Sequence, residues 1–397
     1  MLNINKKNII NYCLFLYVVF LPFEEALASS IGSILKIFGM IIIFFSFFEL
    51  IKGNRIIFRK DFITIMITLW ILLGIISIFW VSSFSWWSYF LKIYISQYVL
   101  FIFISSLPNG YIDLSLIEKG FILGAIIAAM IMIISPSSSH YTDEGRRTIM
   151  LFGTTLDPNV LSGVMSLGLF SSINNIFLKK ELIKNIIISL IIFFGILLTG
   201  SRGALIAIVV AVIIGLFSYK KDIKSILKII AFLILLIIMG YFALKILPDE
   251  LITNRFNLNI LFGQNELASH SHSRYKIWGY ALELIIDKPI LGYGLGNFFS
   301  AIATIYRVCA SHNMYILLMV EGGIIGFLIF LIPIFILWIK TEKNRNIGNV
   351  MLLTSILILA ISLDSITYKY FWIGYLYVYL HYRQYMGKGG KIGDKKN

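Results

Sequence analysis

One stretch organises this chain. Residues Arg274–Gly326 read RYKIWGYALELIIDKPILGYGLGNFFSAIATIYRVCASHNMYILLMVEGGIIG. The stretch starts with an arginine-led amphipathic segment, passes through a proline- and glycine-rich break at 288–296, and ends in an apolar run that opens with His312-Asn313. A proline and closely spaced glycines end a helix, and the apolar run after them is long enough to cross a membrane. We therefore expect a short helix outside the membrane, followed by a membrane helix with a polar end.

The rest of the chain has the composition of a membrane scaffold. Hydrophobic residues make up 59% and charged residues only 14%, whereas about a quarter of a soluble protein is charged. Long apolar runs such as 186–198 and 229–239 alternate with short charged clusters, which predicts an all-α integral membrane protein. The net charge of +14 sits mainly in those clusters and forms no aromatic-basic module, so we expect no nucleic-acid partner.

The apolar runs predict about twelve transmembrane helices. Their approximate ranges are 9–22, 31–50, 62–80, 89–107, 116–135, 156–178, 183–199, 203–219, 225–247, 312–339, 348–364 and 367–386. Most lysines and arginines fall at the termini and in alternate turns, which predicts cytoplasmic termini and a retained N-terminal signal anchor. The lysines near span ends that are assigned to neither side are Lys36, Lys92, Lys245 and Lys369.

We expect one polytopic membrane domain over residues 1–386 and a basic cytoplasmic tail over 387–397. A larger exterior loop, 248–311, separates the ninth and tenth spans. Within it, residues 274–287 have a broad apolar face that includes Tyr275 and Trp278. This pattern predicts an interfacial helix that lies along the membrane surface.

The His312-Asn313 pair is the candidate reactive site. Gly323 and Gly326 follow at about three and about four helical turns, so a continuous helix would bring them close to the line of His312 and let a neighbouring helix approach closely. A helix start also offers free N–H groups to an anion. In the alternative reading, Ser311 or Asn313 is only a helix cap and His312 is an interfacial side chain.

Four arginines are candidates for binding an anion at the exterior boundary. Arg202 lies at the tip of the hairpin between the runs 183–199 and 203–219, and Arg274 opens the interfacial helix. Arg146 and Arg147 end another exterior loop. Guanidinium groups bind phosphates in a bidentate manner, which suits a lipid pyrophosphate. The alternatives are a snorkelling role for Arg202 and an ion pair between Arg274 and Glu266.

Other polar residues have supporting roles in this interpretation. Asp157-Pro158-Asn159 opens the sixth span, where capping of the helix is the simpler reading. Glu321 lies about 14 Å along its helix, either as a functional carboxyl or as the partner of a polar group on a neighbouring helix. Asp364, at the exterior end of the eleventh span, is placed to orient an arginine or the acceptor.

No cofactor or metal is expected. His270-Ser271-His272 has two imidazoles but no evident third ligand. The glycines at 292–296 have the wrong spacing and flanks for a dinucleotide-binding loop.

These residues together resemble the superfamily of O-antigen ligases and Wzy-type O-antigen polymerases, over roughly residues 150–385. The resemblance rests on Thr199-Gly200-Ser201-Arg202-Gly203, Arg274–Trp278, the Lys-Pro and Gly-Tyr-Gly-Leu-Gly-Asn segments at 288–297, and His312-Asn313 with Gly323 and Gly326. Asp157-Pro158-Asn159 is similar to another recurring element of the superfamily.

The resemblance implies a metal-independent, inverting glycosyltransferase embedded in the bacterial inner membrane. It takes a glycan from undecaprenyl pyrophosphate and passes it to an acceptor hydroxyl on the periplasmic or exterior side. Arg202 and Arg274 are implied to hold the pyrophosphate, with Arg146 or Arg147 as a further contact, and His312 to orient or deprotonate the acceptor.

Several functions stay open at this point. A polymerase uses a lipid-linked repeat unit as acceptor, a ligase uses lipid A-core, and a remoter branch modifies protein hydroxyls. We favour the polymerase, with membrane lipid, a flippase and a chain-length regulator as further partners. A polysaccharide flippase or a structural membrane partner is the alternative from another class; a transporter predicts helices broken at the midplane.

Overall fold

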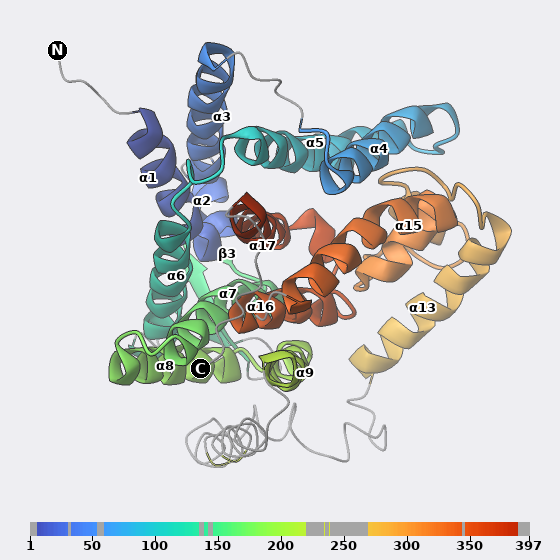
Figure 1. Ribbon diagram of the computed structural model, residues 1–397. Helices are drawn as coiled ribbons and strands as arrows, with labels where there is room; N and C mark the ends of the chain where they lie inside the picture. Colours follow the sequence, from blue (N-terminus) through green and yellow to red (C-terminus); the bar gives the residue numbers. More distant parts are fainter. Residues whose placement is uncertain are drawn as a thin grey trace.

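Figure 1 shows a computed structural model of the chain. It describes residues 6–30, 33–53, 59–134, 139–141, 146–219, 269–343 and 346–387, together with residues 234 and 238. The N-terminal elements are α1 (Lys6–Val19), η1 (Leu21–Phe23), α2 (Glu24–Ser30), α3 (Ile34–Lys52), α4 (Phe62–Ile76), η2 (Ser77–Phe79), α5 (Phe84–Ser106) and α6 (Leu114–Ile134). The central elements are β1 (Ser139–Tyr141), β2 (Arg147–Leu151), β3 (Thr154–Thr155), α7 (Pro158–Phe177), α8 (Leu182–Leu198) and α9 (Arg202–Tyr219). The C-terminal elements are α13 (Ser269–Asp287), α14 (Phe298–Ala303), α15 (Met314–Lys343), α16 (Ile347–Leu359), η5 (Ser365–Thr367) and α17 (Lys369–Gly387).

The prediction of a helical membrane protein is confirmed. Each predicted span coincides with a helix, except 225–247, where residues other than 234 and 238 lie outside the described part of the chain. Within the described part of the chain, six helices are long and apolar enough to cross a membrane, or seven if the bent pair Lys6–Val19 and Leu21–Ala28 is one span. The helices α8, α9 and α16 are apolar but shorter, so the exact count of about twelve stays a prediction.

One small sheet departs from the expected all-α fold. β1 pairs antiparallel with β2, and β2 pairs antiparallel with β3. The turn between β2 and β3 contains Phe152 and Gly153, both at positive φ. The sheet lies in the segment between α6 and α7 and brings Arg146 next to the start of α7.

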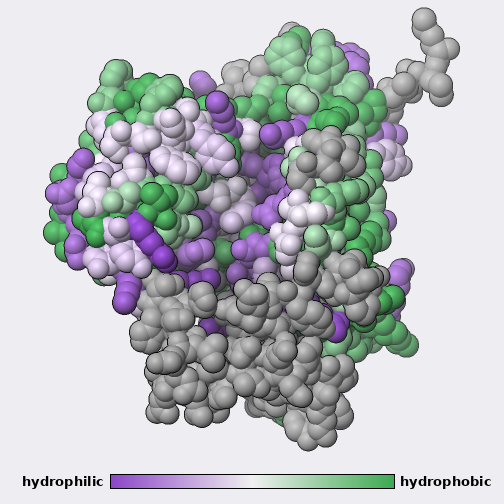
Figure 2. Space-filling model, turned by 180° about the vertical axis from the view of Figure 1, so that it is seen from behind, coloured by the Kyte–Doolittle hydropathy of each residue, from purple (hydrophilic) through white to green (hydrophobic). Residues whose placement is uncertain are grey.

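The aromatic helix α17 lies at the centre of the bundle in Figure 1 and packs against α5, α6, α7, α15 and α16. Trp372 and Tyr375 are almost fully buried. Large buried aromatic rings supply much of the contact area of a core. On the face seen in Figure 2, hydrophilic residues gather in a central hollow, while hydrophobic surface covers its flanks.

The long helix α15 is broken at Gly323, which has φ 57° and ψ −164°. The chain at 289–294 packs into this break: Tyr293 and Gly294 donate their N–H groups to the carbonyls of Val320 and Glu321, each at 2.8 Å. On the other side of the break, the N–H of Ile324 bonds to the carbonyl of Pro289. The polar backbone groups that the break frees are thus satisfied by the segment that follows α13, as a membrane interior requires.

The expectation for the glycine pair in α15 therefore needs correction. A Cβ at Gly323 would lie 2.3 Å from the carbonyl oxygen of Ile290, so the chain that approaches there is a loop and not a neighbouring helix. At Gly326 a Cβ would meet the side chain of Leu73 in α4 at 3.4 Å. Close helix–helix approach is thus limited to Gly326.

Candidate active site

Asn313 caps α15 and His312 precedes it. The side-chain oxygen of Asn313 accepts the N–H groups of Tyr315 at 2.9 Å and Ile316 at 3.2 Å, two of the donors that a helix start leaves free. The capping reading of Asn313 is therefore confirmed. Because the cap uses these donors, they are not available to an external anion.

His312 does not continue the helical face of Gly323 and Gly326. Its φ is 50°, in the left-handed region that residues other than glycine rarely occupy. The expected alignment is wrong for two physical reasons: His312 lies outside the helix, and the helix itself is broken at Gly323. Uncommon backbone conformations of this kind are frequent where a side chain must be presented to a ligand.

Asp364 and Trp278 hold the turn that carries His312. Asp364 Oδ1 accepts the N–H of Asn313 at 2.9 Å and also the hydroxyl of Ser311. On the other side, the indole N–H of Trp278 in α13 donates to the carbonyl of Ser311 at 3.0 Å. The turn is therefore fixed by helix α13 and by the segment that follows α16.

The His312 imidazole itself is half-buried, and within the described residues it has no hydrogen-bond partner. Burial lowers its pKa from the ordinary histidine value, and Arg274 lowers that pKa further, whereas Asp364 and Asp157 raise it. The net shift is downward, so the neutral ring predominates near pH 7. A neutral, unpartnered imidazole can accept a proton.

Arg202 is the first residue of α9, directly after the Gly200-Ser201 turn. The neighbouring Gly203 lies against α16's end, since a Cβ there would come within 2.3 Å of the Ser362 hydroxyl. The Arg202 side chain is half-buried and, among the described residues, makes no hydrogen bond or ion pair. A positive charge at a helix N-terminus opposes the helix dipole, so an external anion would stabilise Arg202.

Arg146 and Arg147 point to different neighbours, as consecutive residues of an extended chain do. Arg146 is only 8% exposed. Its guanidinium donates to the carbonyl of Thr199 at 2.9 Å and to the side-chain oxygen of Asn159 at 2.7 Å. Arg147 donates instead to the carbonyl of Met132, at the end of α6. Of the two candidates, Arg146 is the one that lies beside the Arg202 hairpin.

The three arginines 146, 202 and 274 act on one another electrostatically. Burial lowers the pKa of Arg146 to about 10; Asp157 opposes the shift, while Arg274 and Arg202 add to it. Burial likewise lowers the pKa of Arg274, with Arg202 adding to the shift and Asp157 and Asp364 opposing it. An arginine side chain keeps its charge in proteins at neutral pH. Three guanidinium groups thus share one region with His312, a potential that favours a multiply charged anion.

Asp157 both caps α7 and acts on the charged residues of the site. Its carboxylate caps α7 through the N–H groups of Asn159 at 2.7 Å and Val160 at 3.3 Å, which confirms the capping reading. The same carboxylate acts electrostatically on Arg146, Arg274 and His312. Asn159 in turn orients Arg146.

Glu321 does not belong to this cluster. It is 5% exposed, and its carboxyl accepts the backbone N–H of Phe298 at 3.3 Å and a bond from the N–H of Gly296. Its partners are backbone groups before α14 rather than a polar side chain on a neighbouring helix. We assign it to the support of the loop between α13 and α14.

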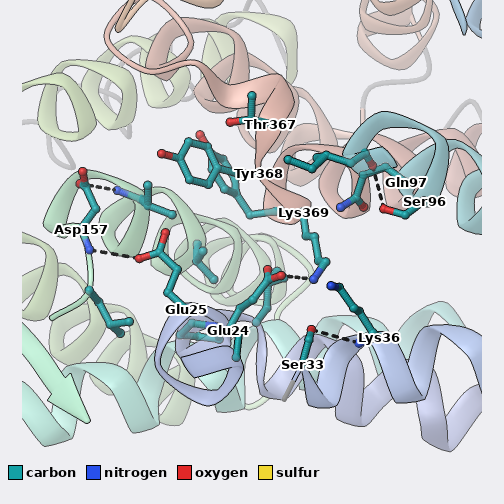
Figure 3. Close-up of a pocket in the computed structure, with 18 of the residues that line it drawn as sticks. Glu24, Glu25, Ser33, Lys36, Ser96, Gln97, Asp157, Thr367, Tyr368 and Lys369 are labelled. Atoms are coloured by element: carbon teal, nitrogen blue, oxygen red, sulfur yellow. Dashed lines mark hydrogen bonds and ion pairs between the residues drawn. The ribbon is translucent and has the colours of Figure 1, made fainter. Parts of the chain in front are cut away.

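A cavity of about 440 Å³ lies next to Asp157. Its polar lining residues are Glu24, Glu25, Ser33, Lys36, Tyr89, Lys92, Ser96, Gln97, Asp157, Thr367, Tyr368, Lys369 and Tyr370. Figure 3 shows Asp157 and Glu25 on one side, Lys36, Ser96 and Gln97 on the other, and the Glu24–Lys369 ion pair between them. The cavity lies between elements far apart in the sequence: α2, α3, α5, the start of α7 and the start of α17.

This cavity was not predicted from the sequence. One signal was present: Lys36, Lys92 and Lys369 are three of the four lysines that fitted neither side of the membrane. Lysines within or beside apolar helices are rare unless they have a function or a partner.

Within the described residues, no group of three or more histidine, cysteine, aspartate or glutamate side chains could hold a metal ion. The side chains of His270 and His272 lie outside the described residues. Metal independence stays a prediction.

Part of the chain matches a known protein family. Residues 187–331 match the family model of the O-antigen ligase. The chain carries an O-antigen ligase domain. This domain includes Arg202, Arg274 and His312, whereas Arg146, Asp157 and Asp364 lie outside the matched residues.

The chain is also similar to a protein of unknown role. An uncharacterized protein of Haemophilus influenzae (strain ATCC 51907 / DSM 11121 / KW20 / Rd) is 30% identical over 207 residues, which are 46% of this chain and 51% of that protein. The chain thus spans about half the length of this curated relative. The family match and the apolar helices together support a membrane-embedded protein.

Proposed function

We propose that this protein transfers a glycan from undecaprenyl pyrophosphate to the hydroxyl group of an acceptor at the exterior face of the membrane. Arg202, Arg274 and Arg146 bind the pyrophosphate of the donor. His312 acts as the general base on the acceptor. The reaction uses no cofactor and no metal ion, because guanidinium groups supply the positive charge that the leaving pyrophosphate needs.

One observation carries the proposal: Arg202 and Arg274 make no hydrogen bond or ion pair among the described residues, and Arg274 acts electrostatically on both Arg202 and the unpartnered His312 imidazole. Glu266, the alternative partner of Arg274, lies outside the described residues. Charged groups held at a membrane boundary are costly unless a partner or a ligand compensates them. A pyrophosphate with bidentate contacts satisfies both guanidinium groups at once. An imidazole beside that anion has no evident structural task, which favours a chemical one.

The reaction is a single displacement. The acceptor oxygen attacks the anomeric carbon from the side opposite the pyrophosphate, so the configuration inverts. The bond from the anomeric carbon to the phosphate oxygen breaks, and undecaprenyl pyrophosphate leaves with the electron pair of that bond. The proton of the acceptor hydroxyl passes to the neutral ring of His312.

The supporting residues set the geometry and the charge. Asp364 fixes the turn that presents His312, and its negative charge stabilises the imidazolium that forms. Asp157 and Asn159 hold the start of α7, and Asn159 orients Arg146. These are positioning residues, since they act through Arg146 or His312.

We propose a lipid-linked repeat unit as the acceptor, which makes the protein an O-antigen or capsular polysaccharide polymerase. Transfer to lipid A-core, which makes it an O-antigen ligase, is the second candidate, and the family match fits either. The enzyme lies in the bacterial inner membrane with both termini in the cytoplasm and the site on the opposite side. A flippase that delivers the donor and a chain-length regulator are its proposed partners.

A transporter is the function from another class that one observation favours, because α15 is broken at Gly323 and broken helices mark transporter sites. Here the free backbone groups of the break bond to the segment 289–294. They therefore have protein partners rather than a transported substrate. The enzyme accounts better for the arginines and His312.

The choice of acceptor is tested with purified protein in detergent and the undecaprenyl-pyrophosphate-linked repeat unit as sole substrate. A ladder of products separated by size supports the polymerase. No ladder, but transfer once lipid A-core is added, supports the ligase. Absence of product with both acceptors overturns the glycosyltransferase proposal.

A further inference from the structure

The charged side chains that line the cavity beside Asp157 are separated by sign: carboxylates lie at one end and unpaired lysines at the other. At the end next to the arginine cluster, Asp157 and Glu25 lie together, and the N–H of Asp157 points to the Glu25 carboxylate at 3.5 Å. In the middle, Lys369 pairs with Glu24. At the other end are Lys36 and Lys92, which make no ion pair or side-chain hydrogen bond within the described residues. Figure 3 shows the Asp157-to-Lys36 order across the cavity.

Lys92 is in an unusual place for an unpaired charge. It is the ninth residue of α5, a candidate membrane span of 23 residues, and therefore lies about 12 Å from the start of that helix. Ser96 and Gln97 follow one turn deeper and line the same cavity. An ionisable residue inside a span points to a bound partner or a polar path. No protein group in the described residues fills that role for Lys92.

Lys36 provides a second amine from a different helix. It lies in the first turn of α3, where Ser33 caps the helix. Both lysine side chains are exposed. They line one cavity and have no carboxylate partner among the described residues, so both ammonium groups are free to receive an anionic group. Their long stems allow the ammonium groups to follow the ligand.

We propose that this cavity binds the acceptor saccharide, and that Lys36 and Lys92 hold an anionic group of that saccharide. The proposal rests on the proposed function. Carboxylates such as Asp157 and Glu25 bond to sugar hydroxyls, and both lie at the end of the cavity next to the arginine cluster, so the uncharged part of the saccharide lies toward His312. The volume of about 440 Å³ falls within the range of roughly 300–1,000 Å³ of small-molecule sites.

The anionic group has two chemical sources: the carboxylate of an acidic sugar, or a phosphate attached to the saccharide. Asp157 links the cavity to the catalytic region, because it lines the cavity and also acts on Arg146, Arg274 and His312. The arginines then receive the donor and the lysines the acceptor. Two separate cationic sites keep the two anionic substrates apart.

The test measures thermal stabilisation of the purified full-length protein in detergent by D-glucuronate, D-glucose 1-phosphate and D-glucose. The wild type is expected to be stabilised by at least one of the two anions and more weakly by glucose. Stabilisation by glucuronate alone assigns a sugar carboxylate, and stabilisation by the phosphate alone assigns a phosphorylated saccharide. Equal effects of glucose and both anions, or no effect of any, overturn the proposal.

Substitutions of the two lysines test whether the anionic sugars bind in this cavity. Lys36→Gln and Lys92→Gln are each expected to weaken anion binding about tenfold, the worth of one charge-assisted hydrogen bond. Lys52→Gln, at the far end of α3, is the matched control and keeps full binding. Lys92→Arg restores the charge and is expected to retain binding. An unchanged affinity in the double variant Lys36→Gln/Lys92→Gln contradicts the assignment; if that variant does not fold, Lys36→Gln against Lys52→Gln decides.

Binding of undecaprenyl pyrophosphate separates this proposal from the proposed function. The double lysine variant should bind it like the wild type. If undecaprenyl pyrophosphate binds and the anionic sugars do not, the acceptor cavity is wrong while the donor site stands. If the sugars bind and undecaprenyl pyrophosphate does not, the donor assignment is wrong.

Discussion

Asp364 accepts the backbone N–H of Asn313 at 2.9 Å. The two residues are far apart in the chain, one before η5 and the other at the start of α15. The bond holds the cap of α15 against the segment between α16 and η5, and His312 lies directly before that cap. Asp364 thereby sets both the position of the imidazole and part of the charge around it.

Replacing Asp364 separates these two effects. Asp364→Ala removes the carboxylate that accepts both the N–H of Asn313 and the hydroxyl of Ser311. The Ser311 hydroxyl oxygen, at 3.1 Å, then remains as the acceptor of that N–H. Because the turn that carries His312 loses two of its hydrogen bonds, each worth about 0.5–3 kcal/mol, we expect glycan transfer to fall about tenfold or more. Asp364→Asn keeps an acceptor oxygen but removes the charge. It should retain the fold and shift the acid limb of the pH profile to lower pH, because Asp364 raises the pKa of His312. Thermal unfolding and pH–rate profiles measure both. Equal profiles for Asp364→Asn and the wild type would contradict the electrostatic role.

Arg202→Lys is expected to lower transfer about a hundredfold, since an ammonium group cannot replace a bidentate guanidinium on a pyrophosphate. The matched control is Arg307→Lys, an exposed arginine that stacks on Tyr306 and should retain activity. The measurement is the rate of transfer at saturating acceptor, with donor binding determined separately. Near-normal transfer by Arg202→Lys would contradict the proposal that Arg202 binds the pyrophosphate.

Transfer activity should depend on the protonation of His312. Its pKa lies below the ordinary value of about 6.5 because burial and Arg274 outweigh Asp364 and Asp157. The neutral, active ring is present above that lowered pKa, so activity is expected to be full at pH 7 and to fall only as the pH drops below about 6.5. A profile of transfer rate against pH tests this. An acid limb centred above pH 7 contradicts the lowered pKa.

Gly323→Ala should destabilise the protein. The added Cβ would lie 2.3 Å from the carbonyl oxygen of Ile290, at a φ of 57°, and a residue other than glycine costs about 1–3 kcal/mol in such a backbone conformation before any clash. Gly279→Ala in α13 is the control, because nothing lies within 4 Å of its added Cβ; it should be neutral or stabilise by about 0.5–1 kcal/mol. Thermal unfolding in detergent compares the two. Equal stability of both variants would show that the break in α15 does not require glycine.

The helices and their order follow from the apolar runs, because a run of membrane length has few alternatives to a helix. Local capping was also predictable: Asp157 and Asn313 are in the positions that side chains of their kind favour at helix starts. The break at Gly323 was not, since the glycine motif fits close helix packing as well as a distortion. Its cause is the segment 289–294, whose approach depends on tertiary structure.

For the site, the sequence supplied the residue types but not their grouping. Nothing local separates Arg146 from Arg147; only the β2 strand shows that one faces Asn159 and the other Met132. The lysine-lined cavity was hidden for the same reason, because Lys36, Lys92 and Lys369 come from three helices distant in sequence. Each of these lysines is a charged residue in or beside an apolar run of the sequence. That pattern is unusual, but it does not show which residues lie next to one another.

His312→Ala tests the central claim most directly. Purified wild type and variant are given the undecaprenyl-pyrophosphate-linked repeat unit together with the acceptor that the wild type uses, and both product formation and donor binding are measured. We predict that the variant binds undecaprenyl pyrophosphate like the wild type, through the arginines. We also predict that it forms product at least about a hundredfold more slowly, because a general base typically contributes a factor of about 10²–10⁴ to the rate. Transfer by His312→Ala at the wild-type rate would contradict it.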